Sequence, residues 1–395
     1  MTSAAASTQP LGSLIDKGYK PREPAIDDEV WNLNLDQIEP HSGRVLSKCM
    51  LNASKLGPST HAFDCGTVLY SKLRPYLNKV VVADENGVAT TELVPLRCDE
   101  SRLNAQYLAY FLRGPDFLRF ATNVVAGAKM PRMVMSEFWK FPVPLPPLPE
   151  QRRIAAILDQ ADALRAKRRE ALAQLDNLTQ SIFIEMFGDP VGNPLRWPET
   201  LKLGAVANIV SGVTKGRKIG NVPTRVVPYL AVSNVQDKAL CLAAVKLIEA
   251  SEAEIDRYRL QPNDLLLTEG GDPDKLGRGT LWNDELPECI HQNHIFRVRV
   301  TSTAVVPLFL NWLVGSTRGK KYFLRSAKQT TGIASINMTQ LREFPLLLPP
   351  LALQQTFATR IQSVESLKAT HRAALAELDA LFASLQHRAF AGQLS

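Results

Sequence analysis

The sequence predicts an α+β chain in which the same arrangement, a globular segment followed by a long helix, is present twice. A block of 47 residues recurs after 203 positions, which indicates an internal duplication. Each copy of the block carries a heptad pattern of apolar residues, and each follows a segment with extended stretches and a short amphipathic helix. We therefore expect two pseudo-symmetric α/β domains separated by an antiparallel coiled coil of two helices.

The duplication is clearest around two proline-rich motifs. The motif FPVPLPPL begins at Phe141, and its counterpart FPLLLPPL begins at Phe344. The offset continues without a gap to Phe187 and Phe390, and 19 of the 47 aligned residues are identical. A long helix is expected after each motif, because proline keeps the approach extended and costs no hydrogen bond in a first helical turn. Gly188, which is followed by prolines, ends the first helix.

These signals divide the chain into four parts. The first eleven residues are expected to form a disordered tail of the first domain. The boundaries are a first globular domain at 1–145, a central long helix at 146–190, a second globular domain at 191–347 and a C-terminal long helix at 348–395.

Apolar residues in both predicted helices follow the 3-4-3-4 spacing of a coiled-coil seam. A helix of this length cannot bury its own apolar stripe, so the two equivalent stripes are expected to bury each other. Antiparallel pairing is the economical arrangement, because in a parallel pair the second domain would have to return along the full length of the first helix. Antiparallel pairing places the two domains at opposite ends of the coiled coil. The predicted seam residues are Ile154, Ile157, Leu164, Arg168, Leu175, Leu178 and Ile182 in the first helix, and Phe357, Val364, Leu367, His371, Leu378, Leu381 and Leu385 in the second.

Two polar residues, Arg168 and His371, interrupt the seams at equivalent positions. Polar seam residues typically fix the register of a coiled coil at some cost in stability. We expect His371 to be a half-exposed seam residue rather than a ligand or a pH switch.

The globular segments share a plan although their sequences have diverged. Each contains an extended stretch, a second strand, a short amphipathic helix, and then a basic stretch with a glycine loop. One scaffold with two different sets of loops suits a protein that recognises two different things. The predicted elements, in this order, are 65–75, 90–97 and 104–112 in the first segment and 262–271, 291–300 and 308–313 in the second.

Composition restricts the classes of protein that the chain can belong to. The 395 residues are 45% apolar and 22% charged, which excludes a disordered or collagen-like chain. No run of apolar residues is long enough to span a membrane, and residues 1–10 lack the pattern of a secretory signal. The five cysteines are odd in number and not closely paired, so we expect a reducing cytoplasm.

The charge of the chain favours a polyanionic partner. The net charge is +7, and residues 191–347 carry 20 basic and 14 acidic side chains. We therefore expect the binding of nucleic acid to depend mainly on the second globular segment.

The sequence gives no sign of catalysis. It lacks the glycine-rich cofactor loop and the Asn/Asp-Pro-Pro-aromatic motif of an amino methyltransferase, and it lacks the acidic-x-Lys partner of a nuclease. Residues 315–321 superficially resemble a P-loop but have the wrong glycine spacing, so we expect a basic helix start. Cys289, His291 and His294 lack the ligand number and spacing of a zinc site. No catalytic residue and no metal ligand is predicted.

DNA recognition requires cations for phosphates and forked polar side chains for base edges. Such residues occur on the expected loops of each segment and, in the second segment, also on one face of a basic helix. The candidates are Ser71, Lys72, Arg74, Lys129 and Arg132 in the first segment, and Lys215, Arg217, Lys218, Ser233, Asn234, Lys275, Arg278, Lys320, Lys321, Arg325, Lys328, Gln329, Thr330, Thr331, Ser335 and Asn337 in the second.

Several motifs resemble the specificity subunit of type I restriction–modification enzymes. They are SKLRPYL at 71–77, PPLPEQ at 146–151, its copy at 349–354, and LLLTEGGDPDKLGRG at 265–279. The resemblance covers essentially the whole chain and implies two target recognition domains that bind one asymmetric, bipartite sequence in double-stranded DNA. It also implies methyltransferase and restriction subunits as partners, which bind S-adenosylmethionine, ATP and Mg²⁺, with no cofactor in this chain.

Two other classes of function remain open from the residues alone. The paired helices could organise protein partners without any reading of DNA, and an unrecognised nuclease is disfavoured by the missing carboxylates. Salt-dependent binding to duplex DNA would distinguish a DNA-reading protein from a scaffold.

Overall fold

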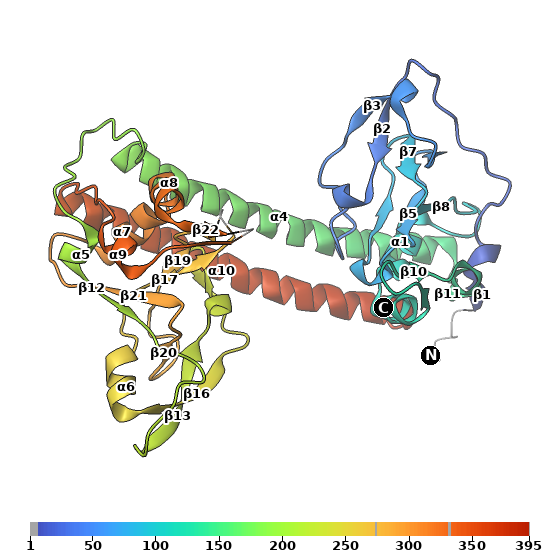
Figure 1. Cartoon of the computed structure of the whole chain (residues 1–395). Helices are drawn as coiled ribbons and strands as arrows, with labels where there is room; N and C mark the ends of the chain where they lie inside the picture. The colour runs from blue at the N-terminus through green and yellow to red at the C-terminus, as the bar shows by residue number, and fades with distance from the viewer. Residues whose placement is uncertain (1–6, 273–274, 331–332, 395) are drawn as a thin grey trace. The chain divides into compact units, whose positions relative to one another are not determined.

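The computed structural model describes residues 7–272, 275–330 and 333–394, the side chains of residues 329, 330 and 333 excepted (Figure 1). The chain forms two compact units: unit 1 comprises residues 1–170 and 371–395, and unit 2 comprises residues 171–370. The long helices α4 (Leu148–Phe187) and α10 (Leu351–Phe390) each contribute residues to both units.

Both long helices are slightly shorter than predicted. Each begins directly after a Pro-Pro pair, because the fixed backbone of proline suits the approach to a helix better than its interior. α4 is followed by Gly188 with φ of +74°, and α10 by a turn at Gly392 with φ of +69°. The two predicted long helices are therefore confirmed, and their ends lie at Leu148–Phe187 and Leu351–Phe390.

The remaining elements of unit 1 form small sheets and short helices (Figure 1). One sheet has the strand order β3-β2-β7-β4, and another has the order β6-β5-β8. The elements are β1 (Thr8–Pro10), β2 (Glu29–Leu33), β3 (Met50–Asn52), β4 (Thr60–Phe63), β5 (Val68–Ser71), β6 (Val80–Val82), β7 (Gly87–Thr90), β8 (Leu93–Leu96), α1 (Ala105–Leu112), α2 (Pro115–Asn123), β9 (Val125–Ala126), β10 (Arg132–Met133), α3 (Met135–Phe138) and β11 (Pro142–Pro144), with 3₁₀ turns at Leu11–Ser13, Leu35–Gln37, Ala53–Lys55 and Pro75–Leu77.

Unit 2 has sheets with the strand orders β16-β13-β20, β12-β21-β17-β19 and β18-β23-β22. Its elements are α5 (Leu203–Val206), β12 (Ala207–Ser211), β13 (Thr224–Leu230), β14 (Val235–Gln236), β15 (Ala239–Leu240), β16 (Lys246–Ser251), α6 (Glu252–Tyr258), β17 (Leu265–Thr268), β18 (Gly270–Gly271), β19 (Gly279–Leu281), β20 (Ile290–His291), β21 (Ile295–Val300), α7 (Pro307–Val314), α8 (Thr317–Ser326), β22 (Lys328–Thr330), β23 (Ile333–Ser335) and α9 (Met338–Arg342), with a 3₁₀ turn at Val232–Asn234.

The two units share one topology. The order β6-β5-β8 in unit 1 corresponds to β19-β17-β21 in unit 2, and the pairing is antiparallel in both. Likewise β2 pairs antiparallel with β3 and parallel with β7, as β13 does with β16 and β20. The strands and short helices predicted for both segments are therefore confirmed, and the duplication extends into regions where the sequences have diverged.

The amino-terminal residues contradict the prediction of a disordered tail. Residues 1–6 lie outside the described residues, but β1 pairs with β11 and the Leu11 side chain is buried. The Leu11 amide donates to the Phe141 carbonyl at 2.9 Å, and in unit 2 the Leu203 amide donates to the Phe344 carbonyl at 2.9 Å. This first strand was missed because it is short and pairs with a proline-rich segment about 130 residues later.

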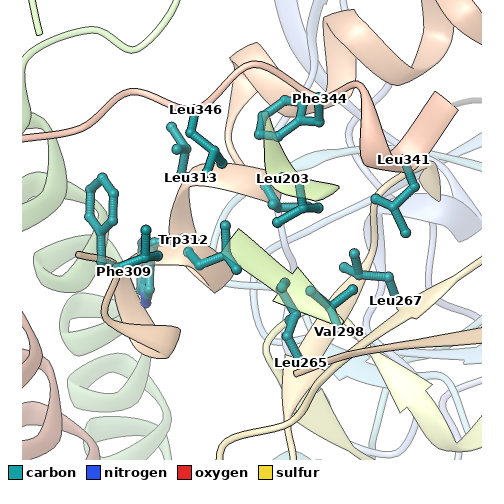
Figure 2. Packing of buried hydrophobic residues seen from close by; sticks show 14 of the residues in the cluster. Leu203, Leu265, Leu267, Val298, Phe309, Trp312, Leu313, Leu341, Phe344 and Leu346 are labelled. Carbon is teal, nitrogen blue, oxygen red and sulfur yellow. The ribbon is translucent and has the colours of Figure 1, made fainter. Parts of the chain in front are cut away.

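Each unit has its own apolar core. In unit 2 the core joins α5, β17, β21, α7, α9 and the segment after α9, and Figure 2 shows Leu203, Leu265, Val298, Leu313 and Phe344 among the packed side chains. Residues from both long helices belong to it, because one face of each helix completes the apolar layer. Among the described residues, no helix combines the length and the apolar character that crossing a bilayer requires.

The long helices pair antiparallel within each unit. In unit 1 the Arg165 Nε atom lies 2.6 Å from Asp379 Oδ1, and Arg168 Nη1 lies 3.2 Å from His371 Nδ1. Residue numbers rise along one helix as they fall along the other, and the same holds for the contacts of Phe183 with Phe357 and of Asp176 with Lys368 in unit 2. The two polar seam residues thus contact each other, and His371 is half-buried, as predicted.

One row of the predicted seam faces the other helix except at Arg168, which is exposed, and the other row is displaced by one residue. Ile154, Ile182 and Phe357 are buried, and Leu175, Val364, Leu378 and Leu385 are half-buried. In the other row, the buried or largely buried positions directly follow the predicted ones: Leu158, Arg165, Thr179 and Lys368. Leu164, Leu178, Leu367 and Leu381 are exposed instead. The prediction failed because apolar identity favoured the leucines, whereas the polar neighbours find partners in the interface.

In unit 1 this displaced row is stabilised by ion pairs around Arg165. The guanidinium lies 2.7 Å from Asp162 on its own helix and 2.6 Å from Asp379 on the other. It also lies over the Phe382 ring, 4.3 Å from the ring centroid. Arg165 therefore links the helices through both its charge and its flat face.

In unit 2 Lys368 has the position that Arg165 has in unit 1. Only 6% of the residue is exposed, and its Nζ atom lies 2.7 Å from Glu365 and 2.6 Å from Asp176. An ammonium can be buried at this depth because two carboxylates compensate for its lost hydration. The triad is therefore repeated, with one cation and one acid changed.

A buried glutamine joins α4 to unit 1. The Gln151 amide nitrogen donates to the carbonyls of Arg102 and Pro146, both at 2.8 Å, and its oxygen accepts from the Asn104 amide at 2.9 Å. The side chain thereby satisfies backbone groups at the start of α1 and at the turn before α4.

Gln354 joins α10 to unit 2 in the same way. It donates to the carbonyls of Ala304 and Pro349 and accepts from the Val306 amide at 2.9 Å. Gln151 and Gln354 are both fully buried. The duplication has thus kept both the residue and its hydrogen bonds.

Candidate nucleic-acid interface

A short hairpin in each unit brings together many of the predicted DNA-binding residues. In unit 1, β9 and β10 form the hairpin, and the Arg74 amide donates to the Pro131 carbonyl beside it at 2.8 Å. In unit 2, β22 and β23 form the hairpin, and β18 pairs with β23. We call the two surfaces the hairpin platforms; they comprise residues 72–77 and 125–133 in unit 1, and residues 269–272, 275–279, 328–330 and 333–335 in unit 2.

The platform of unit 1 presents cations beside an exposed aromatic ring. Arg74 is exposed in the left-handed conformation, with φ of +49°, and Tyr76 follows it with 45% of its surface exposed. Lys129 and Met130 are exposed at the hairpin, and Lys72 is half-buried. Exposed cations can contact phosphates, and an exposed ring can stack on a base.

The platform of unit 2 follows a basic helix. Ser316 caps α8, and the exposed cations Lys320, Lys321 and Arg325 are followed by Lys328 at the start of β22. The P-loop-like residues 315–321 are therefore a helix start, as predicted. The Tyr322 hydroxyl donates to the Gln340 carbonyl, and Gln340 donates back to the Ser326 carbonyl, so α8 is fixed against α9.

The glycine loop at 214–218 presents two of its three cations to solvent. Lys215 and Lys218 are exposed, whereas Arg217 forms two contacts with Glu254, at 2.5 and 2.7 Å, and donates to the Glu249 carbonyl. The hydrogen bonds from Arg217 lower the pKa of Glu254 to about 2. The prediction of Arg217 as a phosphate clamp is corrected: its guanidinium fastens the loop to α6.

Three further candidates use their polar groups inside the fold. Ser71 is buried and donates to the Leu73 carbonyl. Asn234 is buried and bonds the backbone of residues 231, 241 and 244. Asn337 is exposed, but its oxygen accepts from the Gln340 amide and caps α9. Ser71 and Asn234 are therefore unavailable to a duplex, whereas the oxygen of Asn337 caps α9 and its base-reading role stays a prediction.

The remaining candidates of unit 2 differ in how far they are occupied. Lys275 pairs with Asp272, and Arg278 donates to Gln236 at 3.2 Å. Ser233 is exposed and Ser335 is half-buried on β23. Thr331 lies outside the described residues, and Gln329 and Thr330 belong to β22.

The cluster of cysteine and histidine residues takes part in ordinary packing. His291 is fully buried, its Nδ1 atom lies 3.0 Å from the Ile295 carbonyl oxygen, and burial lowers its pKa to about 3. Burial raises the pKa of the Cys289 thiol to about 12. Within the part of the chain that the structure describes, no three His, Cys, Asp or Glu side chains form a group that could hold a metal ion.

Sequence reasoning assigned no DNA-reading role to Glu92, Glu269 or His294, although Glu269 belongs to the platform of unit 2 and the other two residues contact platform residues. Arg132 forms a two-pronged ion pair with Glu92, and His294 contacts Glu269 at 2.5 Å. In the structure these residues stand directly at the ends of β8, β17 and β21, whereas the predicted extended stretches at 90–97, 262–271 and 291–300 included them. The predicted candidates are cations and uncharged polar residues, so no acidic residue is among them.

Two α/β units of one topology, each with a basic hairpin platform and each joined to paired long helices, define a duplicated recognition protein. The family model for the type I restriction modification DNA specificity domain matches residues 62–175 and 197–380. The chain belongs to this family, and it is a DNA specificity subunit that is not itself catalytic.

Curated relatives and solved structures agree with this assignment. The chain is 24% identical to the EcoKI specificity subunit of Escherichia coli strain K12 over 315 residues, and 24% identical to the StySPI specificity subunit of Salmonella potsdam over 314; both alignments cover 75% of this chain and 67% of the relative. It is 29% identical to the EcoDI specificity subunit of E. coli over 178 residues, which are 44% of this chain and only 39% of that relative.

The fold is similar to those of solved specificity subunits. The S subunit of a type I restriction–modification system from M. genitalium matches 97% of this chain and 96% of its own, with a TM-score of 0.56 and 14% identity. A chain from a structural study of complex assembly and conformational transition in the type I R-M system matches over the full length of both chains, with a TM-score of 0.55 and 17% identity. The predicted fold class and family are confirmed.

Proposed function

We propose that the chain reads an asymmetric, bipartite sequence in double-stranded DNA, with one part read by each globular segment. The segments at 1–145 and 191–347 are then the two target recognition domains. The observation that carries this proposal is the pair of hairpin platforms, which share one backbone arrangement but present different side chains. Two readers of the same construction and different chemistry are what an asymmetric site requires.

Partner subunits are proposed to bind the long helices. Leu164 and Leu381 are exposed in unit 1, and Leu178 and Leu367 are exposed in unit 2. These leucines are related by the duplication, and exposed apolar residues at heptad spacing favour docking of a partner helix. We assign this surface to methyltransferase subunits, which would bind S-adenosylmethionine and act on an adenine of each half-site. Restriction subunits with ATP and Mg²⁺ would join that complex.

A reducing, cytoplasmic location is part of the same proposal. All five cysteines are free, and Cys98 and Cys289 are buried, which is typical of a protein from a reducing compartment. The proposal requires the methyltransferase subunits and the DNA to be in the same compartment as this chain.

Salt dependence of duplex binding tests the proposal. Binding that neutralises Z phosphates has an affinity whose logarithm falls with the logarithm of salt concentration at a slope of about −0.9Z. The variants Lys215→Ala and Lys218→Ala are each expected to weaken binding to all sequences and to flatten this slope by about one. Lys246→Ala, an exposed cation on β16, serves as the matched control.

A domain exchange tests the division of labour. Replacing residues 191–347 by the corresponding domain of another family member is expected to change one half of the recognised sequence and leave the other unchanged. Absence of salt-dependent duplex binding, with partner assembly intact, would instead support a scaffold that organises protein subunits without reading DNA.

A further inference from the structure

Three positions in each unit meet where two strands end beside the hairpin. They are Lys72, Glu92 and Arg132 in unit 1, and Glu269, His294 and Ser335 in unit 2. We call each set a junction trio. In both units the first residue directly follows a central strand, the second directly precedes its neighbour, and the third lies on the hairpin.

The backbone shows that the two trios are equivalent. In unit 1 the Lys72 amide donates to the Glu92 carbonyl at 3.0 Å, and the Lys72 carbonyl accepts from the Met133 amide at 2.8 Å. In unit 2 the Glu269 amide donates to the His294 carbonyl, and the Glu269 carbonyl accepts from the Ile336 amide, both at 2.9 Å.

The hairpins are in the same register with respect to these trios. Leu73 is bridged to Arg132 in unit 1, and Gly270 is paired with Ser335 in unit 2. The three positions are therefore fixed on a common frame of backbone hydrogen bonds, and only their side chains differ.

In unit 1 the trio holds a guanidinium by one edge. Arg132 Nε lies 3.0 Å from Glu92 Oε1, and Arg132 Nη2 lies 2.7 Å from the same oxygen. The side chain of Arg132 is 43% exposed, whereas that of Glu92 is 22% exposed. The hydrogen bonds from Arg132 lower the pKa of the Glu92 carboxyl. A guanidinium has five donors, so this pairing leaves its outer edge, with the Nη1 donors, for a base.

In unit 2 the trio holds a carboxylate instead. His294 Nδ1 lies 2.5 Å from Glu269 Oε2, and the side chains are 55% and 33% exposed. The other oxygen of Glu269 remains an acceptor. A half-exposed carboxylate is unexpected in a segment with an excess of cations that is to approach phosphates, unless it accepts a hydrogen bond from a base.

The chemistry of base edges separates the two trios. An arginine fork donates to O6 and N7 of guanine, and a glutamate accepts from the N4 amino group of cytosine. Elsewhere in the fold the duplication has kept polar side chains that serve structure, such as Gln151 and Gln354. The trio has two cations in unit 1, whereas unit 2 has a carboxylate, a histidine and a serine on the same frame of backbone hydrogen bonds. Such a change of side chains is expected at positions that select different sequences.

We propose that the junction trios contain base-reading side chains, with Arg132 selecting guanine in unit 1 and Glu269 selecting cytosine in unit 2. Glu92 and His294 are positioning residues that orient them. This inference rests on the proposed function, because it assigns residues to a DNA site that each unit reads.

Selection from a randomised duplex pool tests the inference. The full chain, co-expressed with its methyltransferase subunit, is used to capture duplexes that are then sequenced. Glu269→Gln is expected to lower the preference for cytosine at one position of one half-site by about tenfold or more. Because glutamine pairs with N6 and N7 of adenine, adenine should gain at that position, and the other half-site should stay unchanged.

Matched variants separate reading from folding. Glu252→Gln removes an exposed carboxylate that pairs with Arg225 in the same unit, and it should leave the selected sequence unchanged. Arg132→Lys keeps the charge but loses the fork, so guanine preference should fall at one position of the other half-site. Urea unfolding of each variant shows whether the fold is retained.

The outcomes are distinguishable. If the unmodified chain selects no sequence, the proposed function fails and the inference fails with it. If the unmodified chain selects a bipartite sequence and folded Glu269→Gln and Arg132→Lys variants select the same one, the inference alone is overturned. A uniform loss of affinity for all sequences would also overturn it, because that result assigns the trios to phosphate contact or to structure.

Discussion

The glutamine contacts at the starts of the long helices differ from the hairpin platforms in what the duplication has preserved. At the helix starts, Gln151 and Gln354 are the same residue, equally buried, and bonded to equivalent backbone groups. At the platforms, Lys72 is replaced by Glu269 on an equally well-defined backbone. The difference shows that buried polar groups tolerate little change, because an unmet hydrogen bond is costly, whereas half-exposed positions are free to acquire new chemistry.

The ion-pair triads between the long helices lie between these extremes. Arg165 and Lys368 are different cations, yet each contacts one acid on its own helix and one on the other. The charge and geometry are retained, but the exact side chain is not. A cation of either kind meets the requirement, since two carboxylates compensate for its burial in each unit.

The largest expected effect is the loss of the buried glutamine at the start of either long helix. Gln354→Ala leaves backbone groups of residues 304, 306 and 349 without their partner and should lower the free energy of unfolding by about 3 kcal/mol. Gln151→Ala should have an effect of similar size, because its bonds are equivalent. Urea unfolding measures both, and the exposed neighbour Gln355→Ala should change stability by less than about 0.5 kcal/mol. Similar losses for Gln354 and Gln355 would contradict the comparison.

A smaller effect is expected at Arg217, together with a change in pH dependence. The pKa of Glu254 is about 2 in the folded chain, below its ordinary value of 4.5, so its contribution is present above pH 4.5 and is lost as pH falls toward 2. Arg217→Ala should lower stability at neutral pH by about 1–2 kcal/mol and remove most of this acid-side slope. Unfolding measured from pH 2 to pH 6 gives the result.

Lys218→Ala is the control for that variant, because Lys218 is the exposed neighbour. It should keep the stability and the acid-side slope of the unmodified chain. An unchanged slope in Arg217→Ala would show that another group holds the Glu254 carboxylate.

The smallest effect is expected at the cap of α9. Asn337→Ala removes the acceptor for the Gln340 amide and should cost about 1 kcal/mol of stability, while the selected DNA sequence stays the same. Asn337→Asp retains the cap and should retain the stability. A changed base preference in the alanine variant, with the fold intact, would support the role that the sequence suggested for this residue.

Much of the fold followed from local patterns. The prolines before α4 and α10, the glycines after them and the heptad spacing defined both helices to within a few residues at most ends. The alternating and apolar runs located β5, β8, β17 and β21. The first strand was missed because β1 is short and its partner β11 lies far away in the sequence.

The candidate site was less predictable because exposure and pairing depend on distant residues. Arg217 and Lys218 are adjacent cations in one glycine loop, yet only the structure shows that Glu254 holds the first and leaves the second exposed. The sequence predicts Asn234 as a base-reading amide, whereas in the structure its side chain forms three hydrogen bonds with the backbone.

By itself, the sequence determined the duplication, the positions of the long helices, their antiparallel pairing and the family. These features depend on identity at a fixed offset and on short-range periodicity. Tertiary structure alone decided which heptad row is buried, because Arg165 and Lys368 enter the interface between the long helices where each forms an ion pair with an acid of the facing helix. It also decided which side chains meet at the junction trios, since each trio joins residues that are 20 to 66 positions apart in the chain and adjacent only after folding.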